Sequence, residues 1–252
     1  MLKKSLFLLL MFSLFSFLII LVVKKRSSLE TKIIQSQRFV EDIKDTVAPQ
    51  PTIIVADGLP DSHLIKTAFI PQAPFKDWSD PWQDACEEAA LLTVDYYYKN
   101  QTPTPQDIKT SVLSMIDFEQ KQGWSHDVNV SQMATIAAKY LNLTPKIIND
   151  PSLKDIKTFI ASNTPVIVPA SGKTLYKENK NFRSGGPYYH NLVILGYNDQ
   201  KQQFTVHDVG TQYGAYFHYS YSLLMSAIHD FPASNLKEDI DSGSKTVLVL
   251  VK

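Results

Sequence analysis

The order of hydrophobic periodicities along the chain restricts its fold more than any other feature. From Ala68 onward, apolar residues first recur at helical spacing and later form short runs typical of strands. Helices followed by strands, without regular alternation of the two, indicate an α+β domain and not a series of βαβ units. The 252 residues are 44% hydrophobic, which is enough for one substantial core. We therefore expect one α+β domain with an appendage.

Local signals assign the individual elements. A first helix is expected from about Ala85 to Tyr98, because acidic side chains occupy its first turn. Thr104 has the position of an N-cap for a second helix that runs toward Gln120. The remaining helices are expected after the candidate caps Ser131 and Ser152, ending near Leu141 and Ser162, and over Tyr221–His229. Strands are expected at Pro165–Ala170, Tyr189–Tyr197, Gln203–Asp208, Gly214–Tyr219 and Thr246–Val251.

The amino-terminal segment has the character of a membrane span. Residues 5–23 are uncharged and apolar, and their number is close to the roughly 20 residues that a helix needs to cross a bilayer. The run ends directly at Lys24-Lys25-Arg26 without a small-residue cleavage site, which favours an uncleaved transmembrane helix over a cleaved signal peptide. We therefore divide the chain into an anchor, 1–26, a stalk with little fixed structure, 27–62, and a folded domain, 63–252.

The distribution of charge bears on partners and location. The short head before the apolar run favours an amino terminus inside the cell, which predicts a single-pass membrane protein with an extracytoplasmic domain. Residues 1–26 hold five basic side chains and no acid, so the remainder carries 20 basic against 25 acidic residues. A mildly acidic domain lacks the basic surface that binds the phosphate backbone of a nucleic acid. The pattern predicts a lipid bilayer as a partner and argues against nucleic acid.

The chain has a single cysteine, Cys86, at the start of the first expected helix. One thiol allows no intramolecular disulfide. A helix amino terminus lowers the pKa of a thiol and makes it nucleophilic, whereas Glu87 and Glu88 would raise that pKa unless they point away. We interpret these two acids as capping charges or structural partners, not as bases. Free cysteine is also common as a small core residue, so both interpretations of Cys86 stay open at this point.

A hairpin brings a histidine near an acid. The runs at 189–197 and 203–208 flank a polar turn centred on Asp199. Antiparallel register about this centre sets His190 opposite Asp208, with Cβ atoms about 5 Å apart. A carboxylate in this position orients an imidazole that acts as a general base. A histidine on a core strand is otherwise a structural residue, and a bulge would change the register.

The loop Lys173–Pro187 leads directly to His190 and is long and polar. It has the character of either a lid beside a site or an ordinary surface excursion. His207 is expected to face away from His190. The chain has neither a second cysteine nor a His-Glu-x-x-His helix, so we expect no metal and no cofactor.

Five segments form a recognisable series: Ile70-Pro71-Gln72-Ala73-Pro74, Trp82-Gln83-Asp84-Ala85-Cys86-Glu87-Glu88-Ala89, Pro165-Val166-Ile167-Val168-Pro169-Ala170, Gly186-Pro187-Tyr188-Tyr189-His190 and His207-Asp208-Val209-Gly210-Thr211. Together they resemble bacterial papain-like cysteine peptidases related to the bacteriocin leader peptidases that cut after a double glycine. The resemblance covers about residues 66–231. No transporter segments follow, so we expect a peptidase-like domain without the ABC transporter.

The resemblance implies a papain-like fold, with the nucleophile at a helix start and the histidine and aspartate on an antiparallel sheet. By position, it implies that Cys86 is the nucleophile, His190 the base and Asp208 the orienting acid. It also implies that Gln72 binds the oxyanion. Gln83 is a rival for that role, because Gln72 is farther from the cysteine than the corresponding glutamine of the leader peptidases.

These features predict a membrane-anchored cysteine peptidase or amide hydrolase that forms an acyl-enzyme on Cys86. Its expected substrate is a peptide or a cell-wall peptide. One alternative is a cell-wall amidase or acyl transferase with the same triad, because one triad serves many acyl transfers. The other is an inactive membrane-tethered binding module on a peptidase scaffold, which predicts an unreactive thiol.

Overall fold

The computed structural model describes residues 58–252. The expected membrane anchor, residues 5–23, lies outside these residues, as does most of the expected stalk. Within the described residues, none of the helices combines the length and the apolar character that a membrane crossing requires.

The domain contains both helices and strands. The strands are β1 (Ser62–Leu64), β2 (Thr144–Asn149), β3 (Val166–Ser171), β4 (Tyr189–Asn198), β5 (Gln203–His207), β6 (Phe217–Ser220) and β7 (Thr246–Val251). The α-helices are α2 (Cys86–Lys99), α3 (Pro105–Lys121), α4 (Val130–Lys139), α5 (Leu153–Ala161), α6 (Gly172–Leu175) and α7 (Tyr221–Ala227). Two 3-10 helices are η1 (Trp82–Asp84) and η2 (Lys237–Ser242).

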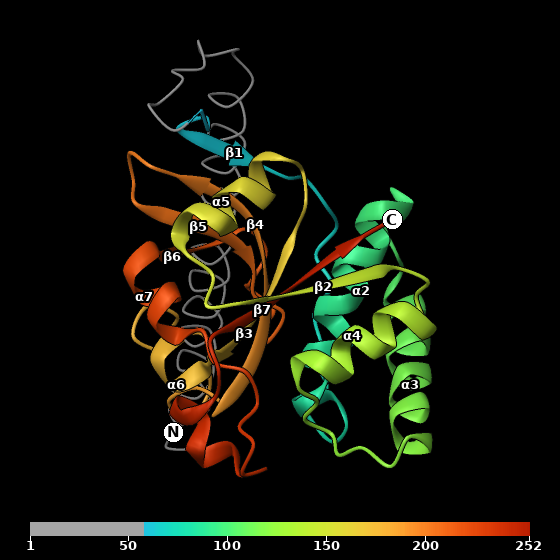
Figure 1. Ribbon diagram of the computed structural model, residues 1–252. Helices are drawn as coiled ribbons and strands as arrows, with labels where there is room; N and C mark the ends of the chain where they lie inside the picture. Colours follow the sequence, from blue (N-terminus) through green and yellow to red (C-terminus); the bar gives the residue numbers. More distant parts are fainter. Residues whose placement is uncertain (1–57) are drawn as a thin grey trace, which may run out of the picture. The chain divides into compact units, whose positions relative to one another are not determined.

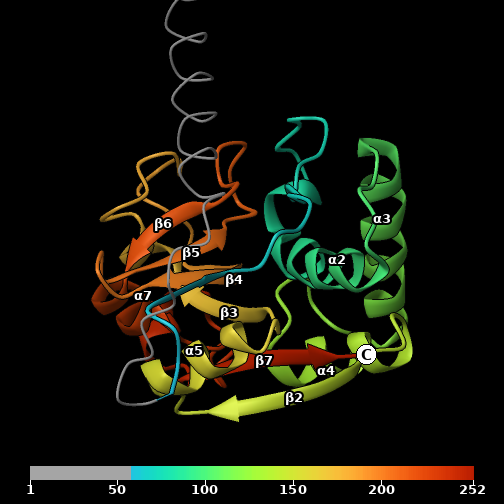
Figure 2. The ribbon, with the colours of Figure 1, turned by 90° about the horizontal axis from the view of Figure 1, so that it is seen from above.

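One antiparallel sheet organises the domain, in the order β2-β7-β3-β4-β5-β6, with β1 paired to β4. Helices α2, α3 and α4 are grouped on one side of the domain, and α6 and α7 lie on the other (Figures 1 and 2). Helix α2 packs against β4, and α4 packs against β2 and β7. The expected α+β class with an antiparallel sheet is confirmed.

Local capping signals set most helix starts. Thr104 and Ser152 cap α3 and α5, and each forms a reciprocal capping box with an aspartate three residues later. The expectation for α4 was wrong, because Asn129 is its N-cap and Ser131 lies inside the first turn. Asn129 accepts a hydrogen bond from the Gln132 N–H while the Gln132 side chain accepts one from the Asn129 N–H, so this pair outcompetes the serine.

Two strands were not expected. β2 is an edge strand with Pro145 near its start and mostly exposed side chains, so it has no apolar pattern to detect. β1 pairs with β4 and begins at Ser62, inside the segment assigned to the stalk. The Tyr197 hydroxyl donates to the Pro60 carbonyl, so the folded region extends a few residues before the expected boundary at residue 63.

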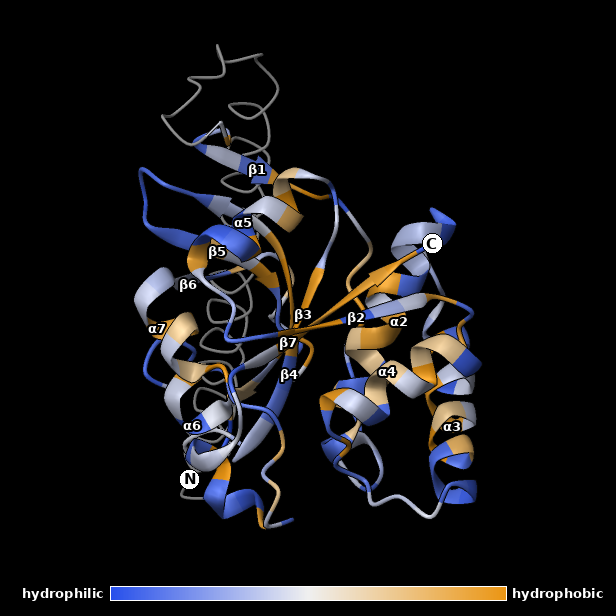
Figure 3. Ribbon diagram, in the orientation of Figure 1, coloured by the Kyte–Doolittle hydropathy of each residue, from blue (hydrophilic) through white to orange (hydrophobic). Residues whose placement is uncertain are grey.

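The core is centred on β4, in which all residues but the last are buried, as expected for a central strand. β3 is buried along its whole length and β7 along nearly all of it. Figure 3 shows β3 and β7 as hydrophobic ribbons that meet in the middle of the domain. At roughly 1.5–3 kcal/mol for each fully buried large apolar side chain, these strands supply the framework that holds the hairpin in place.

The expected register of the β4–β5 hairpin was wrong. Asn198 pairs with Gln203, so the turn contains four residues and the pairing is three residues off the expected register. The bulge between Ile194 and Gly196 then removes one residue, and Val193 pairs with His207. The net offset of two residues is even, so the expected faces of the strands are retained. His190 and Asp208 are therefore diagonal neighbours on one face and are not directly opposite.

Candidate active site

Cys86 is the first residue of α2, as the sequence predicts. The N-cap residue Ala85 has no side-chain group that caps the helix, so the first turn lacks a side-chain acceptor there. Residues 86–95 are all buried, and the small side chains of Ala89 and Ala90 allow α2 to pack closely against β4. This packing fixes the position of the thiol at the edge of the core.

His190 and Asp208 form a buried pair. His190 Nε2 lies 2.9 Å from Asp208 Oδ1, and the two side chains are 2% and 0% exposed. His190 and Asp208 are therefore in contact, as expected, although they are diagonal neighbours and not directly opposite each other. With Nε2 bound to the aspartate, the Nδ1 atom is the ring nitrogen left for a reacting group.

The Asp208 carboxylate has donors on both oxygens. Oδ1 also accepts from the Gly210 N–H at 3.3 Å, and Oδ2 accepts from Asn179 Nδ2 at 2.9 Å and the Tyr219 hydroxyl at 2.5 Å. Burial by itself would raise the pKa of Asp208, but the charge and hydrogen bond of His190 and the hydrogen bonds of Tyr219 and Asn179 outweigh it and hold the pKa below its ordinary value. The aspartate is therefore ionised and can orient an imidazole.

Two neighbours hold the imidazole of His190 in place. The Phe182 ring lies edge-on to it, with ring centroids 5.1 Å apart. A Cβ atom at Gly210 would lie 2.5 Å from His190 Cε1, so only glycine fits beside the ring. The ring is fixed from both sides and by the aspartate.

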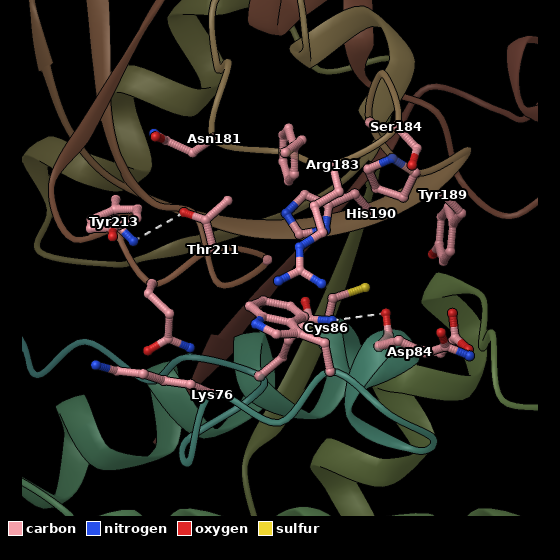
Figure 4. Close-up of a pocket in the computed structure, with 18 of the residues that line it drawn as sticks. Lys76, Asp84, Cys86, Asn181, Arg183, Ser184, Tyr189, His190, Thr211 and Tyr213 are labelled. Carbon is pink, nitrogen blue, oxygen red and sulfur yellow. Dashed lines mark hydrogen bonds between the residues drawn. The ribbon is translucent and has the colours of Figure 1, made fainter.

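Cys86 and His190 line one pocket of about 590 Å³. We call Gln83, Asp84, Cys86 and Asp127 its helical wall and Tyr189, His190, Gly210 and Thr211 its sheet wall. Figure 4 shows Cys86 and Asp84 on the helical side and His190 and Arg183 on the sheet side. A nucleophile and a base on facing walls of one pocket are the arrangement needed for attack on a carbonyl group between them.

The thiol itself has an acidic neighbour. Cys86 Sγ donates to Glu87 Oε2 at 3.0 Å, and Asn191 Nδ2 lies 3.9 Å from the sulfur. Burial, followed by the charge of Glu87, raises the pKa of the Cys86 thiol well above its ordinary value. Glu87 therefore does not point away from the sulfur, and it raises the thiol pKa as the sequence analysis anticipated for that case.

The two candidate oxyanion donors both line the pocket. Gln72 is buried, its backbone N–H donates to the Val209 carbonyl, and its Nε2 donates to the carbonyls of Trp82 and Gln83, each at 2.9 Å. Both amide protons of Gln72 are thus engaged. The Gln83 side chain is exposed and, within residues 58–252, makes no hydrogen bond.

The loop over 173–187 contributes to the site. Asn179 binds Asp208, Phe182 contacts His190, and Arg183 lines the pocket. His207 lies elsewhere, as expected, with its ring against Phe69 and Tyr216. Burial lowers the pKa of His207 to about 3, so it is neutral and structural.

Charges of both signs line the pocket. Lys76 and Arg183 supply positive charge, and Asp84 and Asp127 supply negative charge. Burial, partly offset by Lys237, raises the pKa of Asp127. Within the described residues, Lys76 and Arg183 form no ion pair with an acidic side chain, so both are free to meet a charged ligand.

Sequence reasoning missed Asn179, Asn191, Tyr219 and Gly210. Gly210 follows Asp208 by two residues, and that spacing within the Asp208 segment was a local signal. Asn191 directly follows His190, so its position was a second such signal. Asn179 and Tyr219 reach Asp208 from other segments only through the tertiary fold. Within the described residues, no group of three or more His, Cys, Asp or Glu side chains is arranged to hold a metal ion.

Comparisons with known proteins found one family and several solved structures. The model of the Peptidase_C39-like family matches residues 65–228. Two solved structures are similar: a protein described as a C39-like peptidase from Bacillus anthracis, with a TM-score of 0.44, and xylellain, a cysteine protease from Xylella fastidiosa, with a TM-score of 0.42. Their sequence identities are 14% and 11%, covering 76% and 81% of this chain and 98% and 90% of theirs. No curated protein sequence matches this chain.

Proposed function

This chain belongs to the Peptidase_C39-like family and is a cysteine-type peptidase, and we propose that Cys86, His190 and Asp208 carry its reaction. The observation that supports this assignment most directly is the buried His190–Asp208 pair in a pocket that Cys86 also lines. Both requirements of a thiol peptidase, an oriented base and a nucleophile at a helix start, meet in one cavity.

The proposed reaction proceeds through an acyl-enzyme. His190 Nδ1 takes the proton of the Cys86 thiol, and the thiolate forms a bond to the carbonyl carbon of the substrate. The resulting oxyanion collapses as the C–N bond breaks, and the imidazolium gives its proton to the leaving amine. Water, deprotonated by His190, then attacks the thioester, so that a carboxylate leaves and the thiol is restored. Asp208 holds the ring and stabilises its positive charge throughout.

The oxyanion requires donors on the helical wall. The uncapped start of α2 offers the Cys86 N–H, and Gln83 offers an amide without a partner in the described part of the chain. Gln72, the donor implied by family resemblance, would have to release a backbone carbonyl first. We therefore propose Gln83 as the side-chain donor and Gln72 as a brace for residues 82–83. Gln83→Ala is expected to lower kcat about 10²-fold without loss of stability.

The triad is tested by substitution and by trapping. Cys86→Ala and His190→Ala are each expected to reduce hydrolysis of a responsive peptide at least about 10³-fold. Incubation of the wild type with peptide and peptidoglycan-fragment libraries should give an acyl adduct on Cys86 by mass spectrometry. Full hydrolysis by Cys86→Ala would contradict the assignment. An adduct only with cell-wall fragments would identify a cell-wall amidase or acyl transferase.

We also propose that residues 5–23 anchor the domain in a bilayer, with the domain outside the cytoplasm. The proposal rests on the uncharged apolar segment and its basic flanks. The full chain is expected to remain with membranes after a carbonate wash, and added protease should digest the domain in spheroplasts. Release by the carbonate wash would contradict anchoring, and protection from protease would contradict the orientation.

A further inference from the structure

The Cys86 thiol is hydrogen-bonded to a glutamate and not to the base. Its sulfur lies 3.0 Å from Glu87 Oε2, and within the described residues no hydrogen bond joins it to His190. The Glu87 side chain is fully buried, so water does not screen this contact. A thiol peptidase works through a thiolate–imidazolium pair, but here the thiol points to the Glu87 carboxyl group instead of the His190 imidazole.

Glu87 is held firmly in this position. Its second oxygen, Oε1, accepts from the Val128 N–H at 3.2 Å. The carbonyl of Val128 in turn accepts from the Tyr189 hydroxyl at 3.1 Å. The carboxyl group thus links the start of α2 to the segment before α4 and, through that segment, to β4. The side chain cannot swing away from the sulfur without breaking this chain of contacts.

The groups around the thiol are mainly acidic. Glu87 on α2, Asp127 before α4 and Asn191 on β4 act directly on the thiol. Asp84 on η1, Arg183 in the loop over 173–187, and Tyr189 and His190 on β4 line the same pocket. Behind them, Glu88 on α2 and Glu119 on α3 act on Glu87 and on each other. Burial raises the pKa of Glu87 itself, with Glu88 as the next cause. Negative charge added to this wall disfavours a thiolate, so the thiol keeps its proton.

We propose that Glu87 is a positioning residue that holds the Cys86 thiol protonated in the resting enzyme. The thiol reaches His190 only when its side chain turns about the Cα–Cβ bond and leaves Glu87. The thiol proton then moves from Sγ to His190 Nδ1, giving a thiolate and an imidazolium with no change in net charge. The inference rests on the proposed function, because it concerns access of the nucleophile to the base.

The test measures the thiol directly. The chain has one cysteine, so alkylation by iodoacetamide followed by mass spectrometry reports on Cys86 without any substrate. Full-length wild type and Glu87→Gln, in detergent, are compared from pH 5 to pH 10. In the variant, the amide oxygen keeps the Val128 N–H while the amide nitrogen donates to sulfur, which stabilises a thiolate.

The midpoint of the alkylation profile is expected to fall by at least about one pH unit in Glu87→Gln. While the midpoint stays above pH 7, each pH unit by which it falls increases the thiolate fraction at pH 7 about tenfold. The same fall reduces the nucleophilicity of the thiolate about threefold. The rate of alkylation at pH 7 should therefore rise roughly threefold for each unit. An unchanged midpoint in a variant with wild-type thermal unfolding would overturn the proposal.

Glu88→Gln is the matched control, because Glu88 is the next buried acid on α2 and makes no hydrogen bond to the sulfur. Its midpoint is expected to stay within about 0.3 unit of the wild type. An equal shift in both variants would mean that any lost charge suffices, and this would overturn the specific role of Glu87.

Coupling to the base provides a second readout. Adding His190→Ala to Glu87→Gln is expected to raise the midpoint again, because the freed thiol depends on the imidazole. In the wild-type background the same change should have little effect on the midpoint. If His190→Ala shifts the midpoint equally in both backgrounds, the resting thiol already contacts the base and the proposal fails.

The two proposals fail separately. Cleavage that needs Cys86, together with an unchanged alkylation midpoint in Glu87→Gln, overturns only the role of Glu87. The expected shift in midpoint, together with peptide cleavage that persists in Cys86→Ala, overturns only the proposed reaction.

Discussion

On the sheet wall, the buried carboxylate behind His190 has four donors, whereas on the helical wall the buried carboxyl groups behind Cys86 are short of partners. Asp208 accepts from His190, Gly210, Asn179 and Tyr219. Glu88 Oε2 and Glu119 Oε1 have no hydrogen-bond partner within the described residues. The pKa of Asp208 is accordingly lowered, and the pKa values of both glutamates are raised. One wall is preorganised around a charge, and the other resists charge.

This difference suggests that the two walls have different roles in the proposed reaction. A fully satisfied network fixes the base in one geometry, which is what orientation of an imidazole requires. The same burial that raises the pKa values of these glutamates also raises the pKa of the nearby thiol, and the Glu87 contact adds to this effect, which suits a nucleophile in a resting state. Substitutions behind one wall at a time test whether the two walls differ in this way.

The largest effect is expected from Asp208→Ala. The substitution leaves four donors without an acceptor, three of them buried, so the free energy of unfolding should fall by about 3–5 kcal/mol. Urea denaturation measures this change. Asp208→Asn keeps the volume and should preserve the fold while reducing kcat/KM at least about 100-fold. A folded Asp208→Ala domain of wild-type stability would contradict the role of the network.

The two walls should respond to pH in opposite directions. Burial raises the pKa of Glu119 to about 8, above its unfolded value, so the folded state binds this proton more tightly. The stability that results is present below about pH 4.5 and is lost as the pH rises toward 8. Asp208, with its lowered pKa, contributes stability at neutral pH that is lost below about pH 4.

Glu119→Gln removes the helical part of this dependence. The free energy of unfolding of the wild type is expected to fall by about 1–3 kcal/mol between pH 5 and pH 8, and the variant should show a flatter profile. Asp117→Asn, on the same helix at an exposed position, is the control and should retain the wild-type slope. Parallel slopes for wild type and Glu119→Gln would show that burial behind the helical wall does not raise the pKa of Glu119.

A smaller effect is expected from Tyr219→Phe, which removes one donor and leaves Asn179 on the same oxygen of Asp208. Stability should fall by about 1 kcal/mol, and kcat/KM should fall less than in Asp208→Asn. Tyr221→Phe is the control, because that hydroxyl binds Asp199 outside the site. It should affect stability without affecting kcat/KM. Equal loss of kcat/KM in both variants would contradict a specific role for Tyr219.

The smallest effect on stability is expected from Arg183→Ala. The side chain is exposed and lines the pocket, so the free energy of unfolding should change by less than about 0.5 kcal/mol. KM for peptides with an acidic residue should rise a few-fold, and added salt should reduce the difference. Lys180→Ala, in the same loop but stacked on Tyr176, is the control. An equal change in KM for acidic and basic peptides would contradict charge recognition.

Much of the fold was predictable because its signals are local. The capping boxes at Thr104 and Ser152 span only four residues each, and the start of α2 at Cys86 follows from a short acidic turn. β4 was predictable because a strand that is apolar on both faces must be central. β2 was not predictable, since an exposed edge strand carries no such pattern.

The sequence by itself determined the residue types of the site, the helix that carries Cys86 and the strand that carries His190. The tertiary structure alone decided the register of Asp208, because a four-residue turn and a bulge changed the pairing by amounts that no local rule specifies. It alone brought Asn179 and Tyr219 to the carboxylate and directed Glu87 toward the sulfur. The physical reason is that element formation depends on neighbours in sequence, whereas hydrogen bonds between buried polar groups depend on which segments the packed core brings together.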